Sequence, residues 1–575
     1  MSGTGRTFER AAMLDALRAS AGDEPFDVLV IGGGITGVGV ALDAAARGLR
    51  TALVERDDFA SGTSSKSSKM VHGGLRYLQN GEVRLVYEAL RERRRLMRNA
   101  PHLVEVLPFM IPILTKDGVV SKKVAKALGS AMWMYDITGG WRIGRLHKRV
   151  AADEAARHFP TAHLDKLSAG YLYYDAGADD ARLTLTIART AAQHGAVVVN
   201  RCAVVDITND SEGRADGAVV EADGERIAVR ARCVVNAAGV WADEVRALDE
   251  GTDPDSIRPA KGVHVTIPWE KVRNDIAVII PVRSDKRSLF LVPWSPLPDG
   301  TFRHVYVGTT DTDTDESLDD PQCTGDDIGY VLTALDEALT EPITRDDITG
   351  VWAGMRPLVK AASADGANAK TTDLSRRHQV AVSESGVVRI NGGKLTTYRE
   401  MAEDTVDAVV ARIGAPRRHR RSVTRRLRLF GARPRPGSAA GTLDAHLVGR
   451  FGTETDQVRA LIAFDPSLAE PLVPGQPYVR AEAVYAARHE MVTTLDDLLL
   501  RRTRAHLFDR DATAAAAPAA AQLLAGELGW DAAETERQID RYRSLCVAEA
   551  AAARRHADAH SNTGADDAHL ANASD

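Results

Sequence analysis

Cysteine is scarce in this chain of 575 residues, and the four cysteines that occur follow no pattern. They are Cys202, Cys233, Cys323 and Cys546, and no two of them have the C-x-x-C spacing of a redox or zinc motif. The sequence therefore predicts neither a disulfide framework nor a zinc site, and it indicates reduced thiols in a cytoplasmic setting.

Long apolar runs are also missing. Because no stretch of 18 consecutive apolar residues occurs, the sequence predicts no membrane-spanning helix, and it leaves open a protein that lies on a membrane surface. The N-terminus carries Arg6, Glu9, Arg10 and Asp15 before any apolar run, which is not the pattern of a secretory signal.

An excess of basic charge is the third absence. The 73 lysines and arginines are outnumbered by 79 acidic residues, so the formal net charge is −6 and the molecule has no general attraction to nucleic acid. Hydrophobic residues make up 44 % and charged residues 26 %, the balance of a globular protein. The length implies roughly three domains.

The most informative segment that is present is a strand, turn, helix and strand near the N-terminus, FDVLVIGGGITGVGVALDAAARGLRTALVERDDF, residues 26–59. The apolar run at 28–31 predicts a strand of a parallel sheet, and residues 36–46 predict the helix that follows. Gly32, Gly34 and Gly37 between them have the G-x-G-x-x-G spacing of a dinucleotide-binding turn. Residues 51–54 predict a second strand, which ends at Glu55, where a carboxylate would accept ribose hydroxyls.

Only one such fingerprint occurs, and this favours FAD alone over FAD together with NAD. A predicted strand at 387–390 runs into Gly392 and Gly393 and then a helix, whose N-terminus would place partial positive charge beside a reduced flavin ring. The alternative is a tight strand-to-helix turn without a ligand. A further predicted strand, residues 230–236, runs into Ala238 and Gly239, small residues that allow a ligand to approach the backbone.

The remaining patterns predict a discontinuous domain organisation. Alternating strands and helices indicate an α/β FAD-binding domain with a Rossmann-like sheet, and short β-rich runs indicate an interleaved α+β domain with an antiparallel sheet for the substrate. A linker rich in arginine then leads to a helical C-terminal domain. The expected boundaries are an N-terminal extension at 1–24, FAD-binding segments at 25–115, 175–257 and 379–415, substrate-binding segments at 116–174 and 258–378, a linker at 416–436, helices at 437–555 and a disordered tail at 556–575.

Two predicted helices combine basic and apolar residues. Residues 82–98 interleave arginines with leucine, valine and methionine, and residues 122–135 combine three lysines with Trp133 and two methionines. Either helix fits an interfacial helix on a membrane. Ordinary amphipathic helices with solvated, ion-paired faces are the alternative.

Seven ordered motifs together resemble the FAD-dependent, quinone-linked glycerol-3-phosphate dehydrogenases. The resemblance spans about residues 26–411, and the helical region beyond the linker is similar to the C-terminal domain of that family. HGGLRYL and GGKLTTYR are its most diagnostic parts. The motifs are residues 31–39, TSSKSSKMVHGGLRYL at 63–78, DDARL at 179–183, KGVH at 261–264, GTTD at 308–311, GMRPL at 354–358 and GGKLTTYR at 392–399.

The resemblance implies a glycine-oxidase-like architecture with FAD as cofactor and no metal. It implies oxidation of sn-glycerol 3-phosphate to dihydroxyacetone phosphate, with hydride transfer to flavin N5 and electrons passed to a membrane quinone. It also implies a peripheral position on the cytoplasmic face of the membrane, where the two basic helices would meet the lipid surface. Whether the protein forms a homo-oligomer is left open.

The resemblance further implies which residues form the site. A phosphate clamp would consist of Arg76, Arg356, Arg376 and Lys394, because guanidinium groups meet phosphate oxygens in bidentate geometry. Arg377 adjoins Arg376, so a shift of one residue stays open. The base that takes the hydroxyl proton would be His72 or, as second candidate, His264, and Tyr77 would face flavin or substrate. The expected FAD contacts are Gly32, Gly34, Gly37, Glu55, Thr63, Ser64, Ser65, Ser68, Lys69, Gly73, Ala238, Gly239, Gly392, Gly393, Lys394, Leu395 and Thr396.

Three other functions stay open at this level. An oxidase would use the same flavin and substrate with oxygen as acceptor, and an amino-acid oxidase of the glycine-oxidase type would bind a carboxylate instead of a phosphate. A nucleotide-binding protein without enzymatic activity is the rival from another class.

Overall fold

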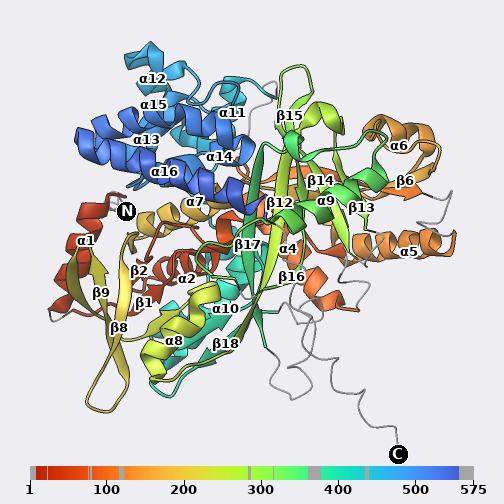
Figure 1. The fold of residues 1–575 in the computed structure, drawn as a ribbon. Helices are drawn as coiled ribbons and strands as arrows, with labels where there is room; N and C mark the ends of the chain where they lie inside the picture. The colour runs from red at the N-terminus through yellow and green to blue at the C-terminus, as the bar shows by residue number, and fades with distance from the viewer. Residues whose placement is uncertain are drawn as a thin grey trace, which may run out of the picture.

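The computed structural model describes residues 8–22, 24–75, 77, 81–114, 122–282, 287–314, 316–360, 377–433 and 440–555. The tail predicted at 556–575 lies outside these residues, and so do Arg76 and Arg376 of the predicted phosphate clamp. Figure 1 shows three regions, a parallel sheet with its helices, a larger mixed sheet beside it, and a group of C-terminal helices above both.

The first region is a six-stranded sheet in the order β18-β19-β11-β1-β2-β7. All neighbouring pairs are parallel except β18 with β19. Strands β1, β2, β7 and β11 are buried along their whole length. The bounds are β1 Val28–Ile31, β2 Thr51–Val54, β7 Val197–Val199, β11 Val234–Asn236, β18 Gln379–Val382 and β19 Val388–Asn391.

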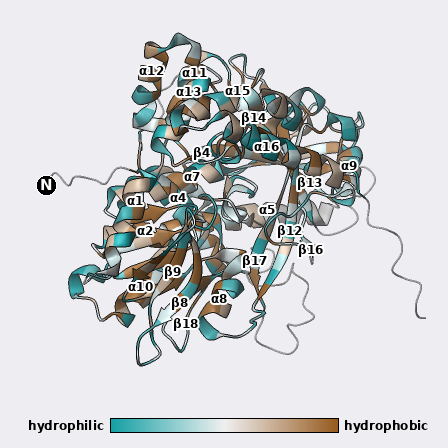
Figure 2. Ribbon diagram, turned by 60° about the vertical axis from the view of Figure 1, so that its left-hand side comes forward, coloured by the Kyte–Doolittle hydropathy of each residue, from teal (hydrophilic) through white to brown (hydrophobic). Residues whose placement is uncertain are grey.

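Helices and a small sheet cover this parallel sheet. The predicted helix after the glycine turn is α2, Ile35–Ala46, which lies against α7, Asp180–Gln193, and α10, Tyr398–Arg412. The strands around α2 and α10 are largely brown in Figure 2, in keeping with the buried core between them. Other elements of this region are α1 Arg10–Arg18, α8 Ala242–Glu250 and a three-stranded antiparallel sheet of β8 Ala203–Asn209, β9 Ala215–Ala222 and β10 Glu225–Arg230.

The second region is a ten-stranded sheet that is antiparallel except where β13 runs parallel to β4. Its strands are β3 Met70–Val71, β4 Glu105–Leu114, β5 Lys148–Ala151, β6 Leu167–Gly177, β12 Ile257–Pro268, β13 Ala277–Pro281, β14 Ser288–Pro296, β15 Phe302–Gly308, β16 Thr312–Asp313 and β17 Gly350–Val359. The helices beside it are α4 Val83–Asn99, α5 Lys122–Thr138, α6 Ala152–His158 and α9 Gly325–Ala338.

Two strands of this mixed sheet come from a segment that the sequence assigns to FAD binding. β3 and β4 lie before residue 115, yet both pair with β6. The chain thus passes from one sheet to the other earlier than composition indicates, because the apolar run EVLPFMIPIL of β4 fits a buried strand of either sheet. The domain boundaries as such stay a prediction.

The third region consists of helices, as the sequence predicts. They are α11 Leu443–Phe451, α12 Thr455–Phe464, α13 Arg480–His489, a π-helix at Asp497–Arg502, α14 Ala505–Phe508, α15 Arg510–Leu528 and α16 Ala532–Ala552. Their apolar faces form a core of their own, which includes Leu495, Leu498 and Leu499. None of the described helices combines the length and apolar character that a membrane crossing requires. Together these observations confirm the predicted fold class.

Candidate active site

The glycine turn between β1 and α2 is built so closely that side chains are excluded from it. Gly32 has a φ of +111°, and a Cβ atom there would come within 2.7 Å of the carbonyl oxygen of Ala237. A Cβ atom on Gly37 would lie 1.9 Å from the carbonyl oxygen of Gly32. The first glycine therefore permits the turn, and the third lets α2 pack directly on it.

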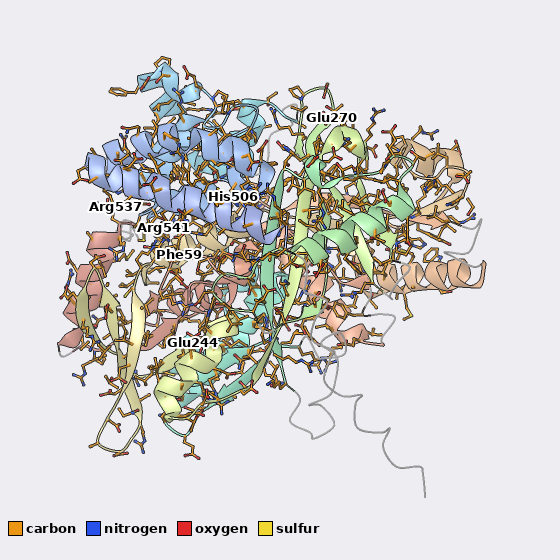
Figure 3. The ribbon with its side chains drawn as sticks, viewed as in Figure 1. Phe59, Glu244, Glu270, His506, Arg537 and Arg541 are labelled. Carbon is orange, nitrogen blue, oxygen red and sulfur yellow. The ribbon has the colours of Figure 1, made fainter. Side chains whose placement is uncertain are left out.

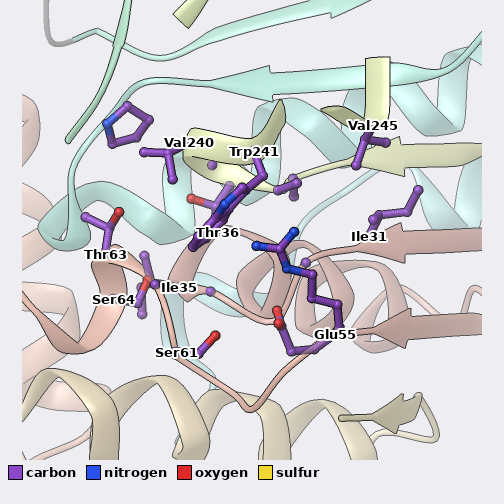
Figure 4. A pocket seen from close by; sticks show the side chains of 18 of the residues that line it. Ile31, Ile35, Thr36, Glu55, Ser61, Thr63, Ser64, Val240, Trp241 and Val245 are labelled. Atoms are coloured by element: carbon purple, nitrogen blue, oxygen red, sulfur yellow. Dashed lines mark hydrogen bonds between the residues drawn. The ribbon is translucent and has the colours of Figure 1, made fainter. Parts of the chain in front are cut away.

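A cavity of about 410 Å³ opens at the carboxyl ends of β1, β2 and β11, next to this turn (Figure 4). The N-terminus of α2 faces it, and the first residues of that helix, Ile35 and Thr36, belong to its lining. Eleven of the residues expected to hold FAD also line it: Gly32, Gly34, Glu55, Thr63, Ser64, Ala238, Gly239, Gly392, Gly393, Lys394 and Leu395. The lining does not include Gly37, Ser65, Ser68, Lys69, Gly73 or Thr396.

Glu55 stands at the end of β2 and is held in place by the backbone of the turn. Its carboxylate accepts hydrogen bonds from the N–H groups of Gly33, at 2.5 Å, and Asp57, at 2.9 Å. Burial raises the pKa of Glu55 to about 7, although these two hydrogen bonds oppose the shift. Figure 4 shows the side chain at the wall of the cavity, where a ribose hydroxyl could reach it.

Residues 61–69, which we call the serine loop, supply Ser61, Gly62, Thr63, Ser64 and Ser67 to the lining of the cavity. Its Ser64 hydroxyl accepts a hydrogen bond from the Ile35 N–H at 2.8 Å, at the N-terminus of α2. Ser67 donates to a carboxylate oxygen of Asp180 at 2.6 Å, and the Lys69 ammonium lies 3.3 Å from the other oxygen. Asp180 thus draws together Ser67 and Lys69 in the second half of the loop.

The second glycine pair, after β19, returns the chain to the same cavity. Gly392 and Gly393 have φ values of +73° and +83°, so the turn needs glycine at both positions. Lys394 and Leu395, which follow, line the cavity with them. The late turn and the N-terminal fingerprint therefore share one site, although more than 300 residues separate them.

Arg356 is the one predicted clamp arginine within the described residues. It lies on β17, where it faces Ala260 of β12, and its guanidinium donates to the hydroxyl oxygen of Thr309 at 2.8 Å and the carbonyl of Thr310 at 2.9 Å. It also forms an ion pair with Asp311 at 3.1 Å. The motifs KGVH, GTTD and GMRPL thus meet around a single cation.

His264 lies behind this arginine on β12. Its ring stacks on Trp352 with 4.7 Å between ring centroids, and its Nε2 is 2.8 Å from the Ser68 hydroxyl. The Nδ1 atom is buried and has no hydrogen-bond partner among the described residues. Burial lowers the pKa of His264 well below its usual value, and the positive charges of Lys69 and Arg356 add to this, so the ring is neutral near pH 7.

The motif HGGLRYL lies beside the late turn. The ammonium of Lys394 is 3.6 Å from the centroid of the Tyr77 ring, a close cation–π contact. The N–H of His72 donates to the hydroxyl of Thr396 at 3.1 Å, which joins the same two segments a second time. The structure therefore brings His72, Tyr77 and Lys394 into one neighbourhood.

Two groups of residues near the site carried little signal in the sequence. Trp241 lines the cavity, and its ring binds the Arg56 guanidinium at 4.7 Å and donates to Asp319 at 2.8 Å. Behind HGGLRYL, the carboxylate of buried Asp175 accepts from the Tyr135 hydroxyl at 2.7 Å and from the Gly73 N–H at 3.2 Å. The only clue to Trp241 is an aromatic residue just after the small residues Ala238 and Gly239.

The residues of this cavity fit FAD. Uncharged glycine backbone and the N-terminus of α2 suit a pyrophosphate, and a carboxylate at the end of β2 suits the ribose hydroxyls. The cavity then continues to Gly392, Gly393 and Lys394, where the flavin end of the same molecule would lie.

Comparison with known proteins agrees with this assignment. Residues 27–399 match the family of FAD dependent oxidoreductases, and residues 422–535 match the C-terminal domain of alpha-glycerophosphate oxidase. Glycerol-3-phosphate dehydrogenase 2 of Mycobacterium tuberculosis is 41 % identical over 563 residues, which cover 95 % of this chain and 93 % of the relative. The mitochondrial glycerol-3-phosphate dehydrogenase of Arabidopsis thaliana is 37 % identical, with 93 % and 88 % covered.

Solved structures give the same result. The glycerol-3-phosphate dehydrogenase of Bacillus halodurans, complexed with FAD, matches with a TM-score of 0.72 and 28 % identity, covering 94 % of this chain and 97 % of that one. The L-alpha-glycerophosphate oxidase of Mycoplasma pneumoniae, at 17 % identity and a TM-score of 0.51, covers 67 % of this chain and shares the fold.

Proposed function

Because this chain belongs to the FAD-dependent glycerol-3-phosphate dehydrogenase family, we propose that it oxidises sn-glycerol 3-phosphate to dihydroxyacetone phosphate and passes the electrons to a membrane quinone. The observation that carries the substrate assignment is the meeting of three motifs around Arg356, whose guanidinium is held in a fixed position and whose neighbour Pro357 lines the cavity.

Binding of the phosphate falls to Arg356 and Lys394, with Arg76 and Arg376 as further proposed members of the clamp. Arg356 has its orientation set by Thr309, Thr310 and Asp311, so little side-chain entropy is lost when an anion binds. Gly262 leaves the room for it, because a Cβ atom there would lie 2.5 Å from the Arg356 Nη2 atom.

Removal of the hydroxyl proton requires a neutral imidazole near the substrate. His264 is the candidate that is neutral near pH 7, since burial keeps its pKa well below its usual value. His72 is the other candidate, and its backbone is attached to Thr396 at the late glycine turn. When bound, FAD supplies the hydride acceptor, N5 of its ring.

A membrane acceptor is supported by the surface formed by α4, α5 and the turn after α5. Hydrophobic side chains there are exposed to solvent, among them Ile137 at 75 %, Trp133 at 58 % and Trp141 at 51 %. Basic residues stand among them, and the Arg142 guanidinium lies 4.8 Å from the Tyr87 ring and 5.2 Å from the Trp141 ring. Exposed aromatic, aliphatic and basic groups together are typical of a surface that enters a lipid headgroup layer.

An oxygen-using oxidase is the second candidate, since residues 422–535 match the C-terminal domain of alpha-glycerophosphate oxidase. Steady-state turnover with a soluble quinone analogue, compared with hydrogen peroxide release in air, separates the two. A dehydrogenase turns over rapidly with the quinone and releases little peroxide. Stoichiometric peroxide at the full rate without quinone would contradict the proposed acceptor.

A further inference from the structure

The centre of the serine loop connects three parts of the molecule through three consecutive residues. The Thr63 hydroxyl donates to the carbonyl of Met355, on β17 of the mixed sheet, at 2.6 Å. The Ser64 hydroxyl accepts from Ile35 at the start of α2. The Ser65 carbonyl accepts from the guanidinium of Arg504, which belongs to the C-terminal helical region. The wall of the FAD cavity is thus a junction between both sheets and the C-terminal helices.

Arg504 is buried to an unusual degree for an arginine, with 2 % of its side chain exposed. Its Nη2 atom reaches Asp180 at 3.1 Å in addition to the Ser65 carbonyl, and its Nη1 atom donates to the Leu500 carbonyl at 2.7 Å. Asp180 also accepts from the N–H and the hydroxyl of Ser67. One guanidinium therefore binds the Ser65 carbonyl of the loop and also the Asp180 carboxylate, which in turn binds Ser67.

A second contact of the same kind lies just before the loop, at Asp58. The carboxylate of Asp58 is fully buried and accepts from Arg501 at 2.6 Å and from Arg502 at 2.6 and 2.8 Å. Both arginines end the π-helix Asp497–Arg502, a form that is frequent at functional sites. Figure 3 labels His506 on the C-terminal helices and Phe59, the neighbour of Asp58, on the side of the parallel sheet.

General attachment of the C-terminal helices does not require this arrangement. Buried ion pairs contribute little net stability, because desolvation offsets their attraction. A cation that binds a loop carbonyl acts on the position of the loop itself. That loop supplies Ser61, Gly62, Thr63, Ser64 and Ser67 to the lining of the FAD cavity.

We propose that Arg504 is a positioning residue for FAD: by fixing Ser65 and Asp180 it sets the serine loop against the cofactor, so the C-terminal helices complete the FAD site. This inference rests on FAD as the cofactor and on neither the proposed substrate nor the acceptor. Its test contains no substrate, so its failure and that of the proposed function are distinguishable.

The experiment compares the holoenzyme with Arg504→Met and Arg504→Lys. The dissociation constant of FAD is measured from the rise of flavin fluorescence on dilution, and the visible absorption and circular dichroism of bound flavin are recorded alongside. We expect Arg504→Met to raise the dissociation constant at least tenfold and to alter the visible spectrum. Arg504→Lys keeps the charge but lacks the forked guanidinium, so its dissociation constant for FAD should lie between those of the parent and Arg504→Met.

A matched control is Glu527→Gln, which breaks the ion pair of Glu527 with Arg488 between α15 and α13, inside the C-terminal region. It does not contact the serine loop, and it should retain FAD as the parent does. An unchanged dissociation constant and spectrum in Arg504→Met would overturn the proposal, as would equal loss of FAD in Glu527→Gln. If Arg504→Met does not fold, Arg504→Lys decides: weaker FAD binding supports the proposal, and parental binding overturns it.

Discussion

The guanidinium of Arg356 and the carboxylate of Asp311 form an ion pair at 3.1 Å across neighbouring segments of the mixed sheet. The aspartate fixes the cation that we assign to the substrate phosphate, while other N–H groups of the fork remain directed at Thr309 and Thr310. The Arg356 guanidinium, which we propose binds the phosphate, is thus held in position before the substrate binds.

Replacing Arg356 by alanine should weaken binding of glycerol 3-phosphate. Loss of one charge-assisted phosphate contact costs about 1.5–3 kcal/mol, so KM should rise roughly 10- to 100-fold. Arg258→Ala is the matched control, because Arg258, on the neighbouring strand β12, forms a comparable ion pair with Asp313 at 2.9 Å. Equal KM values for the parent and Arg356→Ala, or an equal rise of KM in both variants, would show that Arg356 does not bind the phosphate.

Alanine at Gly37 should prevent FAD binding. The new Cβ atom would lie 1.9 Å from the Gly32 carbonyl oxygen, so the glycine turn must open. The purified variant should be nearly colourless, as its ratio of flavin to protein absorbance will show. Gly526→Ala serves as control, since a Cβ atom in that helix meets no atom within 4 Å and alanine favours helix. A yellow Gly37→Ala protein with parental flavin content would refute this account of the turn.

Acid should destabilise the protein partly through His264. Its pKa in the folded protein lies well below 6.5, so only the unfolded chain takes up this proton as pH falls below about 6.5. Stability from this group is therefore present above that pH and lost below it, with a slope of up to about 1.4 kcal/mol per pH unit. Urea unfolding of the parent and His264→Asn between about pH 7.5 and 5.5 measures the difference. Curves that stay parallel throughout would show that His264 titrates normally.

Charge placed on the proposed lipid-facing surface should detach the protein from membranes. Ile137→Glu and Trp141→Glu each remove a hydrophobic side chain worth about 1.5–3 kcal/mol on burial, so binding to anionic vesicles should drop roughly tenfold or more. Phe464→Glu is the control, because Phe464 is 91 % exposed but lies on α12, among the C-terminal helices. Co-sedimentation with vesicles that is equal for all three variants would speak against this surface.

Sequence reasoning located the parts of the site that depend on local sterics. The glycine turn can be predicted from the sequence because there is no room for a side chain at Gly32 or Gly37. Glu55 can be predicted because it stands at the end of the next strand. Helices α2 and α4 each begin within one residue of the predicted positions, 36 and 82.

Contacts between distant segments could not be read in this way. The pairing of Arg504 with Ser65 and Asp180 joins residues that are 439 and 324 positions apart, and nothing local distinguishes Arg504 from the arginines around it. The recruitment of β4 into the mixed sheet depends likewise on its partners, since an apolar run suits any buried strand. These features follow from tertiary packing alone.

The most direct test of the central claim is the visible absorption spectrum of the purified protein before and after glycerol 3-phosphate is added in the absence of oxygen. The account predicts an oxidised flavin spectrum that is bleached within one turnover by glycerol 3-phosphate and is unchanged by glycine. A protein without flavin bands, or a flavin that glycine bleaches and glycerol 3-phosphate does not, would contradict it.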